Sequence, residues 1–431
     1  EEDPMTVMAK LGEHWKPAKH PDLPDAFAGG WVGFAGYDTV RYQYINKLPF
    51  DNVREQDDRD LPDVHMGLYE EVIVFDHATK QVYGVKWVML EDYTSKDGTV
   101  DAEKAYSEGI KGLDDLMKEL QPETMGTIPF GSVDMRLSGK PEPMKDSNMS
   151  KESFLDAVAT TKEHIKAGDI FQLVLSHRFE RKTKVDPFEV YRALRVVNPS
   201  PYMIYYQGKD CILIASSPEI LCRVDDSRTV VNRPLAGTRA RGKTQAEDLA
   251  LEEDLLADEK ERAEHVMLVD LGRNDVGRVS QMGTVKVEKL MEIERYSHVM
   301  HISSTVTGKL IEDLNPWDVL RAALPVGTVS GAPKVRAMQI IDDLEVSKRG
   351  PYGGGIGYVG FAGEMDIALA LRTMVVPTKQ KKGDEWTIHV QAGAGIVADS
   401  NPESEYQETV NKSAALGRSI DLAERAFLKK K

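Results

Sequence analysis

The sequence is poor in cysteine: Cys211 and Cys222 are the only two among 431 residues, and both lie in apolar, strand-like runs. This disfavours a disulfide framework or a cysteine-rich metal site and favours a reducing compartment. No apolar run approaches the roughly 20 residues that a membrane-spanning helix needs. The first residues, EEDPMTVMAK, resemble neither a secretory signal nor an arginine-rich transit peptide. We therefore expect a soluble protein.

Basic residues are also in deficit, because 55 lysines and arginines face 70 acidic residues and leave a net charge of −15. No basic arm offsets this charge, so the composition disfavours nucleic acid and anionic membranes as partners. Several catalytic motifs are missing as well. There is no G-x-S-x-G turn, no H-E-x-x-H pair, no zinc-type Cys/His spacing and no cysteine nucleophile with its base. Covalent acyl chemistry and zinc-dependent hydrolysis are therefore disfavoured.

The sequence does contain alternating strand and helix patterns. Residues 27–89 carry β-branched and aromatic runs separated by Gly and Asp, which predict strands. Apolar residues recur at helical spacing over 106–120, and the Pro-, Gly- and Ser-rich stretch that follows predicts a linker or long crossing loop to about residue 150. Ser150 is the predicted N-cap of another helix, which Gly168 ends.

Further along, strands are predicted at 170–179, 211–217 and 227–233, followed by one long charged helix over about 246–269. Helix and strand patterns then alternate irregularly to the end, without an internal repeat or low-complexity tract. This organisation predicts a mixed α and β architecture with substantial antiparallel sheet.

Two pairs of glutamates stand three residues apart in predicted helices, so the members of each pair share a helix face. Such carboxylates could supply the oxygen ligands of a magnesium ion, which takes one or two carboxylates plus waters and an anionic substrate. Solvated faces of ordinary acidic helices are the alternative, and spacing alone favours it. The pairs are Glu261 with Glu264 and Glu405 with Glu408.

Three other positions are open to a functional interpretation. Thr328 precedes Ser330 and Pro333, which predict a helix start whose free amides could hold a carboxylate. His301 alternates with apolar neighbours, which favours a packed histidine over a catalytic one. Arg372 lies in an apolar strand pattern and needs an anionic partner, either a ligand carboxylate or an internal Asp or Glu.

Eight motifs occur in a characteristic order: SSPEIL, PLAGTRARG, DEKERAEHVMLVDLGRNDVGRV, YSHVMHISSTV, PVGTVSGAPKVRAMQIID, RGPYGGGIGYVG, ALALRTMVV and QAGAGIVADSNPESEYQETVNK. In this order they resemble the chorismate-utilising enzymes, most closely the anthranilate synthase component I branch. The resemblance extends from about Ser150 to Ala423. It implies an α+β fold of large antiparallel sheets packed as a sandwich, with helices on the outside. We expect an N-terminal region, 1–145, that joins the same sheet assembly, and a chorismate-binding catalytic domain, 146–425.

The resemblance also implies roles for residues that match the family's motifs. The magnesium ion is surrounded by Glu261, Glu264, Glu405 and Glu408, some as direct ligands and some through water. Glu219 donates a proton to the departing ring hydroxyl, and His301 is the catalytic histidine, with Thr328 in the same pocket. Chorismate, a dianion, or the product is bound at positions matching Ala236, Thr238, Tyr352, Arg372, Gly393, Gly395 and Lys412.

Two small differences point to the nucleophile. In the branch that makes aminodeoxychorismate, a lysine that attacks the ring stands at the position of Ala236. In the water-adding isochorismate synthases, a lysine base stands where Gln172 aligns. Because both lysines are absent, the resemblance implies addition of ammonia and elimination of pyruvate to give anthranilate, the first step of tryptophan biosynthesis. The alternatives are an aminodeoxychorismate synthase and, in a different class, a non-catalytic tryptophan-sensing subunit.

The implied partners follow from the ammonia requirement. Free ammonia is scarce at neutral pH and the sequence carries no glutaminase module, so a separate glutaminase subunit and a hetero-oligomer are expected. The family's feedback site for tryptophan is matched in part by Asn198, Pro199, Ser200, Pro201, Tyr202 and Met203. Its other half, an LLES-like strand, is not found in the sequence, which leaves feedback inhibition open. Similarity to plant or algal versions implies the plastid stroma; otherwise the cytoplasm is expected.

Overall fold

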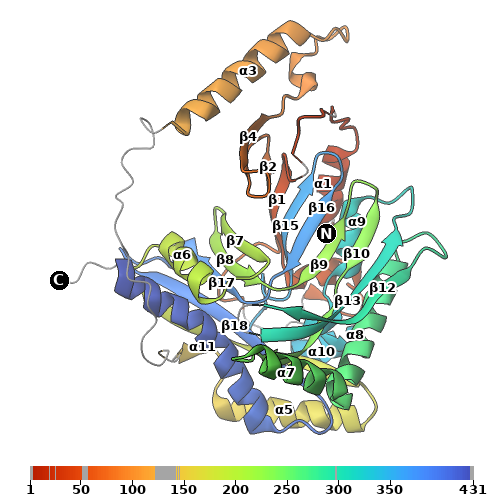
Figure 1. The fold of residues 1–431 in the computed structure, drawn as a ribbon, viewed down its shortest axis with the longest axis vertical. Helices are drawn as coiled ribbons and strands as arrows, with labels where there is room; N and C mark the ends of the chain where they lie inside the picture. Colours follow the sequence, from red (N-terminus) through yellow and green to blue (C-terminus); the bar gives the residue numbers. More distant parts are fainter. Residues whose placement is uncertain are drawn as a thin grey trace.

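The computed structural model describes residues 3–427, except 19, 25, 51–56, 122–141, 143, 145, 297 and 298. Two large antiparallel sheets form the centre of the molecule, and helices lie around them (Figure 1). The predicted linker at 121–150 falls mostly outside the described residues. None of the helices in the described part combines the length and apolar character needed to cross a membrane.

The first sheet has nine strands and joins the N-terminal region to the rest of the chain. Its edge strands are β11 and β2, and β12 pairs with β13 beside the main path. In spatial order the strands are β11 (Leu235–Ala240), β13 (Val299–Lys309), β10 (Thr229–Asn232), β9 (Ile220–Val224), β16 (Met365–Leu369), β15 (Gly355–Gly360), β1 (Gly30–Ala35) and β2 (Val64–Tyr69), with β12 (Lys286–Arg295) on β13.

The second sheet has seven strands, and a separate hairpin stands at one end of the molecule (Figure 1). The predicted strand at 211–217 has these bounds in the structure, and the one at 170–179 forms Gln172–Thr183. In order the strands are β14 (Gly331–Ala332), β6 (Gln172–Thr183), β18 (Trp386–Ile396), β17 (Thr373–Pro377), β8 (Cys211–Ser217) and β7 (Tyr202–Gln207), with β5 (Asp146–Ser147) on β6; the hairpin is β3 (Glu71–Asp76) and β4 (Gln81–Lys86).

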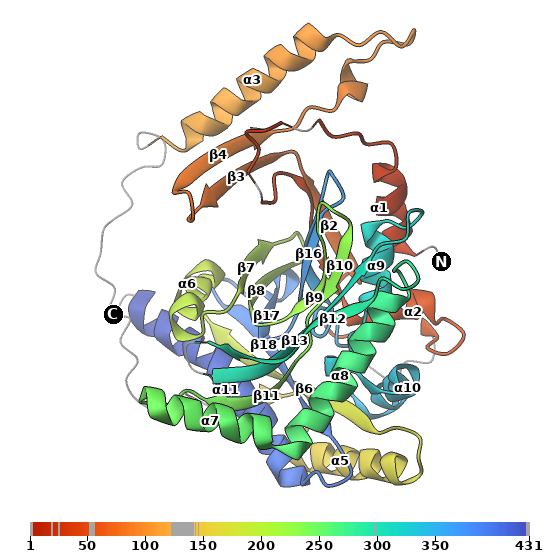
Figure 2. The ribbon, with the colours of Figure 1, turned by 45° about the vertical axis from the view of Figure 1, so that its right-hand side comes forward.

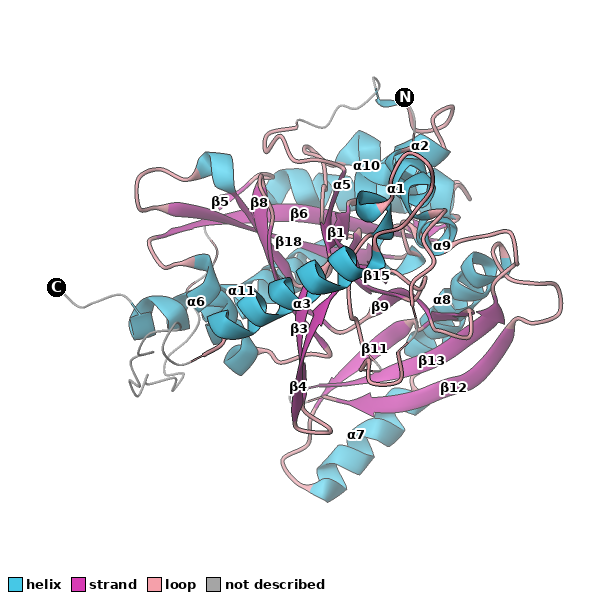
Figure 3. Ribbon diagram, turned by 90° about the horizontal axis from the view of Figure 1, so that it is seen from above, coloured by secondary structure: helices cyan, strands magenta, loops and turns pink. Residues whose placement is uncertain are grey.

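The helices pack mostly on the outer faces of the two sheets, as the view from above shows (Figure 3). They are α1 (Pro4–Gly12), α2 (Val40–Gln43), α3 (Ala102–Glu119), α5 (Lys151–Lys166), α6 (Pro187–Val197), α7 (Gln245–Ala257), α8 (Glu259–Gly277), α9 (Pro316–Ala323), α10 (Lys334–Leu344) and α11 (Pro402–Phe427). Short 3₁₀ turns are η1 (Tyr37–Thr39), η3 (Leu90–Tyr93), η4 (Gly327–Val329) and η5 (Thr378–Gln380).

Buried side chains show that the two sheets pack face to face. Phe34 and Ile356 of the first sheet share one apolar cluster with Leu213 and Val375 of the second. Separate clusters join α1, α8 and α9 to the first sheet, and α6 and α11 to the second. Burial of these apolar faces, at about 25 cal/mol per Å², is the main force that holds the layers together. The predicted α+β sandwich with outer helices is therefore confirmed.

Local signals explain several element boundaries. Ser150 caps α5 through a hydrogen bond from the Ser153 amide at 3.1 Å, as expected. Gly168, just past the end of α5, has φ of +81°, a conformation that glycine adopts at little cost. Cys211 and Cys222 are buried free thiols, which agrees with the absence of a disulfide framework.

One long helix was predicted at 246–269, and that prediction is wrong. The chain forms α7 and α8, which meet at a bend at Asp258 (Figure 2). Asp258 has extended backbone angles, and its carboxylate accepts hydrogen bonds from the amides of Lys260 and Glu261. A capping aspartate starts a new helix here because it satisfies amides that otherwise lack partners. The bend sets the direction of α8, which carries one of the glutamate pairs.

Candidate active site

The chain forms a cavity of about 1020 Å³ where residues from distant parts of the sequence meet. Its lining includes Pro218, Tyr296, Arg372, Glu408 and Lys412, from the β8–β9, β12–β13 and β16–β17 connections and from α11. His301 and Glu219 are buried beside it: the ring of His301 lies 5.7 Å from that of Tyr296, and Glu219 follows Pro218 in the chain. The cavity thus brings together Arg372, Glu408 and Lys412 of the predicted site, with His301 and Glu219 nearby.

Arg372 is one of the cations in the lining of this cavity. It does not lie inside a strand, as the apolar pattern predicted, but in the connection between β16 and β17, with φ of +46°. Such a conformation costs a non-glycine residue about 1 kcal/mol or more and is concentrated at functional sites. Among the described residues no acid pairs with its guanidinium, and burial lowers its pKa. An internal Asp or Glu partner, the alternative from sequence, is therefore not found in the described part of the chain.

A substitution at Arg372 should mainly weaken substrate binding. Arg372→Lys keeps the charge but loses the planar fork that binds a carboxylate through two hydrogen bonds. Losing one charged hydrogen bond costs about 1.5–3 kcal/mol, so we expect KM for a carboxylate substrate to rise about 10-fold or more. Arg192→Lys, on α6 and outside the lining of this cavity, is the control and should leave KM unchanged. Equal KM values for both variants would remove Arg372 from the binding site.

Two glycines of β18, Gly393 and Gly395, leave room for neighbouring side chains to pack close to the backbone of this strand. A Cβ at Gly393 would lie 2.9 Å from the hydroxyl of Tyr352, and one at Gly395 would lie 2.9 Å from Nε2 of Gln172. At Gly393 a side chain would also meet Val174 and the Leu175 carbonyl, so glycine is favoured there, whereas at Gly395 only the end of the flexible Gln172 side chain would have to move. Lys412 of α11 donates to the Gly393 carbonyl at 2.9 Å and forms an ion pair with Glu408 at 2.6 Å. Four of the predicted substrate-binding residues, Tyr352, Gly393, Gly395 and Lys412, therefore adjoin one another.

His301 is held in one tautomer by the segment that carries Gly237 and Thr238. Its Nδ1 lies 2.9 Å from the Gly237 carbonyl and 3.1 Å from the Thr238 hydroxyl. Burial lowers the pKa of His301, so the ring is neutral near pH 7. A carbonyl can only accept, so Nδ1 carries the proton and donates it to Gly237. Nε2 is buried without a partner among the described residues and presents a free lone pair.

Tyr296 is a site residue that sequence reasoning missed. Its hydroxyl donates to Glu294 at 2.8 Å, and Glu294 forms an ion pair with Arg233 at 2.5 Å. This network fixes the tyrosine between His301 and the cavity. The only signal in the sequence is its position five residues before His301, in the same motif.

Glu219 is a carboxyl group that burial keeps protonated. It is 4% exposed, in the connection between β8 and β9. Burial raises its pKa to about 8, although a hydrogen bond from Thr328 and one from the Leu235 amide lower it in part. The Thr328 hydroxyl, on η4, donates to Glu219 at 3.3 Å. At neutral pH the group can therefore donate a proton, as its predicted role requires.

The two glutamate pairs, on α8 and α11, are close enough for Glu408 of one pair to influence Glu264 of the other. Burial raises the pKa of Glu264, and the negative charges of Glu261 and Glu408 raise it further. Burial also raises the pKa of Glu405, and Glu408 adds to this. No three His, Cys, Asp or Glu side chains in the described ranges are grouped so that they could hold a metal ion. The acids converge, but they do not form a closed cage.

The segment with Ala236 adjoins these acids. Ala236 lies opposite Ile302 at a β-bulge between β11 and β13. At Gly237, with φ of +65°, a Cβ would lie 3.2 Å from Oε2 of Glu261. Gln172, the other position that identifies the nucleophile, donates to Glu264 at 3.1 Å. Both positions are therefore in the immediate surroundings of the glutamates.

The arginines of the PLAGTRARG motif bind acids of this chain. Arg239 forms ion pairs with Asp254, Asp258 and Glu261, the last at 3.2 Å. Arg241 donates to Asp248 at 2.8 Å. They thus anchor β11 to α7 and α8, whereas Thr238 of the same motif contacts His301.

The segment predicted to bind tryptophan is divided between two environments. Asn198, Pro199 and Ser200 line the large cavity. The Tyr202 hydroxyl donates to Asp366 at 2.8 Å and accepts from Arg223 at 3.0 Å. Pro201 lies between these two parts, and Met203 pairs with Ser216 in β7 and β8. Regulation through this segment stays a prediction.

Comparison with known proteins places the chain in a family. The family described as chorismate binding enzyme matches residues 3–418, so the chain belongs to it. Within this class, the chain is 58% identical to the chloroplastic anthranilate synthase alpha subunit 1 of Oryza sativa subsp. indica, covering 99% of this chain and 74% of that protein. It is 57% identical to alpha subunit 1 of Arabidopsis thaliana, over 100% and 73% of the two chains.

Solved structures agree with this placement. The crystal structure of anthranilate synthase component I from Streptococcus pneumoniae superposes with a TM-score of 0.80 at 38% identity, over 97% of this chain and 86% of that one. The menaquinone-specific isochorismate synthase MenF of Escherichia coli, at 18% identity and a TM-score of 0.62, shares the fold. The resemblance inferred from motifs is thereby confirmed.

Proposed function

We propose that this chain is the large subunit of an anthranilate synthase, which converts chorismate and ammonia into anthranilate and pyruvate. The observation that carries the proposal is the pair Ala236 and Gln172 beside the glutamates. A lysine at either position would supply an internal nucleophile or a base for water. With neither, the site is suited to a small external nucleophile that brings its own lone pair. The identity of 58% over 99% of the chain to a plant anthranilate synthase subunit supports the same assignment.

Each residue has a role that its chemistry allows. Arg372 and Lys412 would bind the carboxylates of chorismate, with the open backbone at Gly393 and Gly395 beside them. Protonated Glu219 would donate its proton to the ring hydroxyl as it leaves, while ammonia forms the new C–N bond at ring carbon 2. The free Nε2 of His301 is suited to accept a proton as pyruvate leaves and the ring becomes aromatic.

The glutamates fit a magnesium ion in their donor chemistry. Glu264 is buried with two like charges nearby, which is unfavourable unless a cation or proton is present. Mg²⁺ takes one or two carboxylates together with waters and a substrate oxygen, so a closed cage is not required. Glu261, Glu264, Glu405 and Glu408 would hold it, directly or through water. The ion would bind the ring carboxylate and polarise it, which lowers the barrier to loss of the hydroxyl.

Ammonia supply defines the expected partner. Residues 1–431 contain no motif of a glutaminase with an activated cysteine, and we propose that a separate glutaminase subunit delivers ammonia to this site. Tryptophan is the proposed inhibitor, through the segment Asn198–Met203. The plant relatives are named chloroplastic, and on that similarity we propose a plastid location for this chain.

The product assay tests the proposed function directly. The purified chain is incubated with chorismate, magnesium and an ammonium salt at mildly alkaline pH, and the fluorescence of anthranilate is followed. We expect anthranilate and pyruvate in equal amounts, and no product when glutamine replaces the ammonium salt. Accumulation of isochorismate or aminodeoxychorismate would contradict the assignment. Calorimetric binding of tryptophan without turnover under any ammonia source would favour a sensing subunit.

A further inference from the structure

Arg349 is fully buried, with a relative exposure of 0%, and sits between three segments that carry residues of the cleft. It follows α10 and precedes Tyr352 by three residues. All three of its guanidinium nitrogens donate to groups of this chain, so we place it behind the residues that would contact a substrate. Its guanidinium makes hydrogen bonds to η4, to β6 and to a glutamate, and each of the first two leads to a site residue.

The first contact holds η4. Nη1 of Arg349 donates to the carbonyl of Val329 at 2.6 Å. Val329 directly follows Thr328, whose hydroxyl donates to Glu219 at 3.3 Å. The position of the Thr328 hydroxyl depends on the conformation of η4. The hydrogen bond from Arg349 to the Val329 carbonyl holds η4 in place.

The second contact holds the strand that faces the β18 glycines. Nη2 of Arg349 donates to the carbonyl of Val174 at 2.8 Å. Val174 pairs with Gly395, and a Cβ at Gly393 would lie 3.0 Å from Cγ1 of Val174. The spacing between β6 and the open backbone of β18 therefore depends on where Val174 is held.

The third contact is with Tyr352. The guanidinium carbon lies 5.8 Å from the centre of the Tyr352 ring and 4.5 Å from that of Tyr37, both within range of cation–π attraction. The Tyr352 amide also donates to the Arg349 carbonyl at 3.3 Å. The hydroxyl of Tyr352 is the atom that a side chain at Gly393 would strike.

Glu345 compensates the buried charge. It accepts from Nε of Arg349 at 2.9 Å and from Nη2 at 2.6 Å, so the pair is bidentate. Its Oε1 also accepts from the amide and the hydroxyl of Ser176 on β6, both at 2.8 Å. A buried ion pair of this kind often adds little stability compared with apolar residues of the same volume. We therefore expect the Arg349–Glu345 pair to affect the site through the positions it gives to neighbouring groups, and not through added stability.

We propose that Arg349, braced by Glu345, is a positioning residue that sets the relative placement of Thr328, Tyr352 and the β18 glycines. The inference rests on the proposed function, because it assigns those three groups to the reaction. A single planar group donates in three directions here, which an ammonium group cannot reproduce. Such a residue affects the reaction by setting where the groups that contact the substrate lie. A displacement of those groups by about 1 Å can lower the rate about 100-fold.

Arg349→Lys is the test variant, and Arg181→Lys is its matched control. Arg181 is also shielded from solvent and paired with acids, Asp421 and Glu424, but these contacts join β6 to the end of α11. We expect Arg349→Lys to lower kcat about 10- to 100-fold with a smaller change in KM. The pH above which kcat falls should also shift, because the Thr328 bond to Glu219 is disturbed. Arg181→Lys should lower the melting temperature and leave kcat, KM and the pH profile unchanged.

The measurement is chorismate consumption, so that its outcome does not depend on which product forms. A wild-type chain that consumes chorismate without forming anthranilate would sink the proposed function and leave this test intact. Should Arg349→Lys fail to fold, Glu345→Gln takes its place, since the amide retains the volume and loses only the charged pairing; the same decrease in kcat is expected. Wild-type kcat and pH profile in the folded variant, with only a lower melting temperature, would overturn the inference.

Discussion

Replacing Glu219 by glutamine is expected to lower kcat by about 100- to 10,000-fold, the usual contribution of a positioned proton donor. Glutamine preserves the volume and can still accept from Thr328, but it has no proton to give to a leaving hydroxyl. KM for chorismate should change little, because the amide keeps the size of Glu219 and the proton transfer to the leaving hydroxyl contributes in the transition state and not in the bound substrate. Steady-state kinetics with chorismate at saturating ammonia separate the two parameters.

The pH dependence of the wild type gives a second check on Glu219. Burial raises the pKa of this carboxyl to about 8, so kcat at saturating ammonia should hold up to that pH and fall above it. The folded state retains the proton over a range where the unfolded state has lost it. The contribution to the free energy of unfolding is therefore fully present below the unfolded pKa of 4.5 and is lost as pH rises through about 8. Glu219→Gln should abolish both effects.

Glu364→Gln is the control for Glu219. Glu364 is likewise a partly buried glutamate whose pKa burial raises, but it lies in the turn between β15 and β16. We expect it to keep wild-type kcat. If Glu219→Gln retained full activity, or if both variants lost activity equally, the proton-donor role would be refuted.

The second large effect is expected for Glu264→Gln, which should reduce magnesium-dependent turnover at least about 1,000-fold. The negative charges of both Glu261 and Glu408 raise the pKa of Glu264, which places Glu264 at the centre of the proposed metal site. The substitution removes its negative charge from that site. Without metal, the neutral amide relieves that repulsion, and the melting temperature should be unchanged or slightly higher.

Metal binding can be read independently of activity. A ligand that binds only the folded state raises the free energy of unfolding, so magnesium should raise the melting temperature of the wild type and not that of Glu264→Gln. Glu259→Gln, at an exposed position of the same helix, should respond to magnesium as the wild type does. A Glu264→Gln variant with wild-type turnover and the same thermal response to magnesium would exclude a metal at these glutamates.

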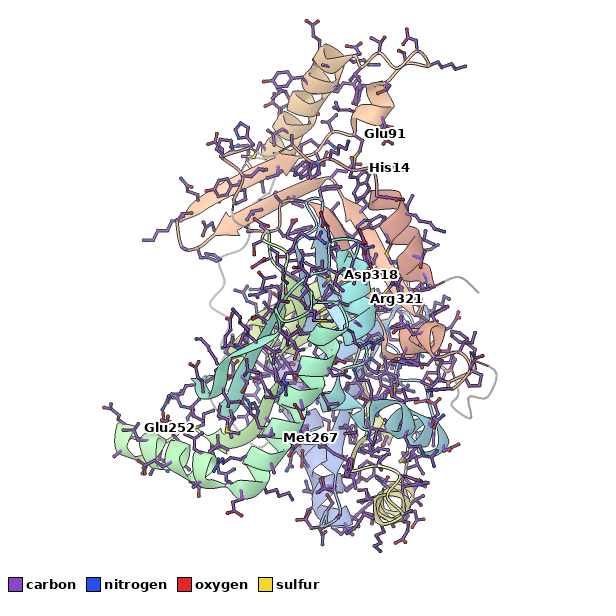
Figure 4. All side chains as sticks on the ribbon, turned by 90° about the vertical axis from the view of Figure 1, so that its right-hand side faces the viewer. His14, Glu91, Glu252, Met267, Asp318 and Arg321 are labelled. Carbon is purple, nitrogen blue, oxygen red and sulfur yellow. The ribbon has the colours of Figure 1, made fainter. Side chains whose placement is uncertain are left out.

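A second cavity, of about 640 Å³, lies between the N-terminal segment and α3. His14 and Glu91 belong to its lining and stand at the opposite end of the molecule from Glu252 on α7 and Met267 on α8 (Figure 4). None of the residues predicted for catalysis lines it. This cavity is therefore separate from the proposed active site.

Much of the fold could be predicted from local patterns. The strand at Cys211–Ser217 and the cap at Ser150 were recognised because strand periodicity and capping depend on neighbours in the chain. The bend at Asp258 was missed because helix-forming Leu, Ala and Glu occur on both sides of it, and the aspartate ends one helix while capping the next. Arg372 was predicted to lie in a strand because its neighbours are apolar, and nothing in these residue types indicates that its backbone is left-handed.

Motifs suggested the residues of the proposed site, but not their protonation or their hydrogen-bond partners. Arg349 escaped notice because its contact with β6 joins distant parts of the chain: it donates to Val174, 175 residues away. Similarly, Gln172 and Glu264 are 92 residues apart and share a hydrogen bond. Such pairings follow from how the two sheets stack, which no short stretch of sequence encodes.

By itself, the sequence determined the class of the protein: an acidic chain with two isolated cysteines and eight ordered motifs of chorismate-binding enzymes. It also determined which side chains are available for the reaction, including the absence of lysine at positions 172 and 236. The tertiary structure alone decided that Glu219 retains its proton near neutral pH and that Arg372 is left without an acid among the described residues. The reason is that protonation and ion pairing depend on burial and on distances between groups, and only the packed sheets and helices set these.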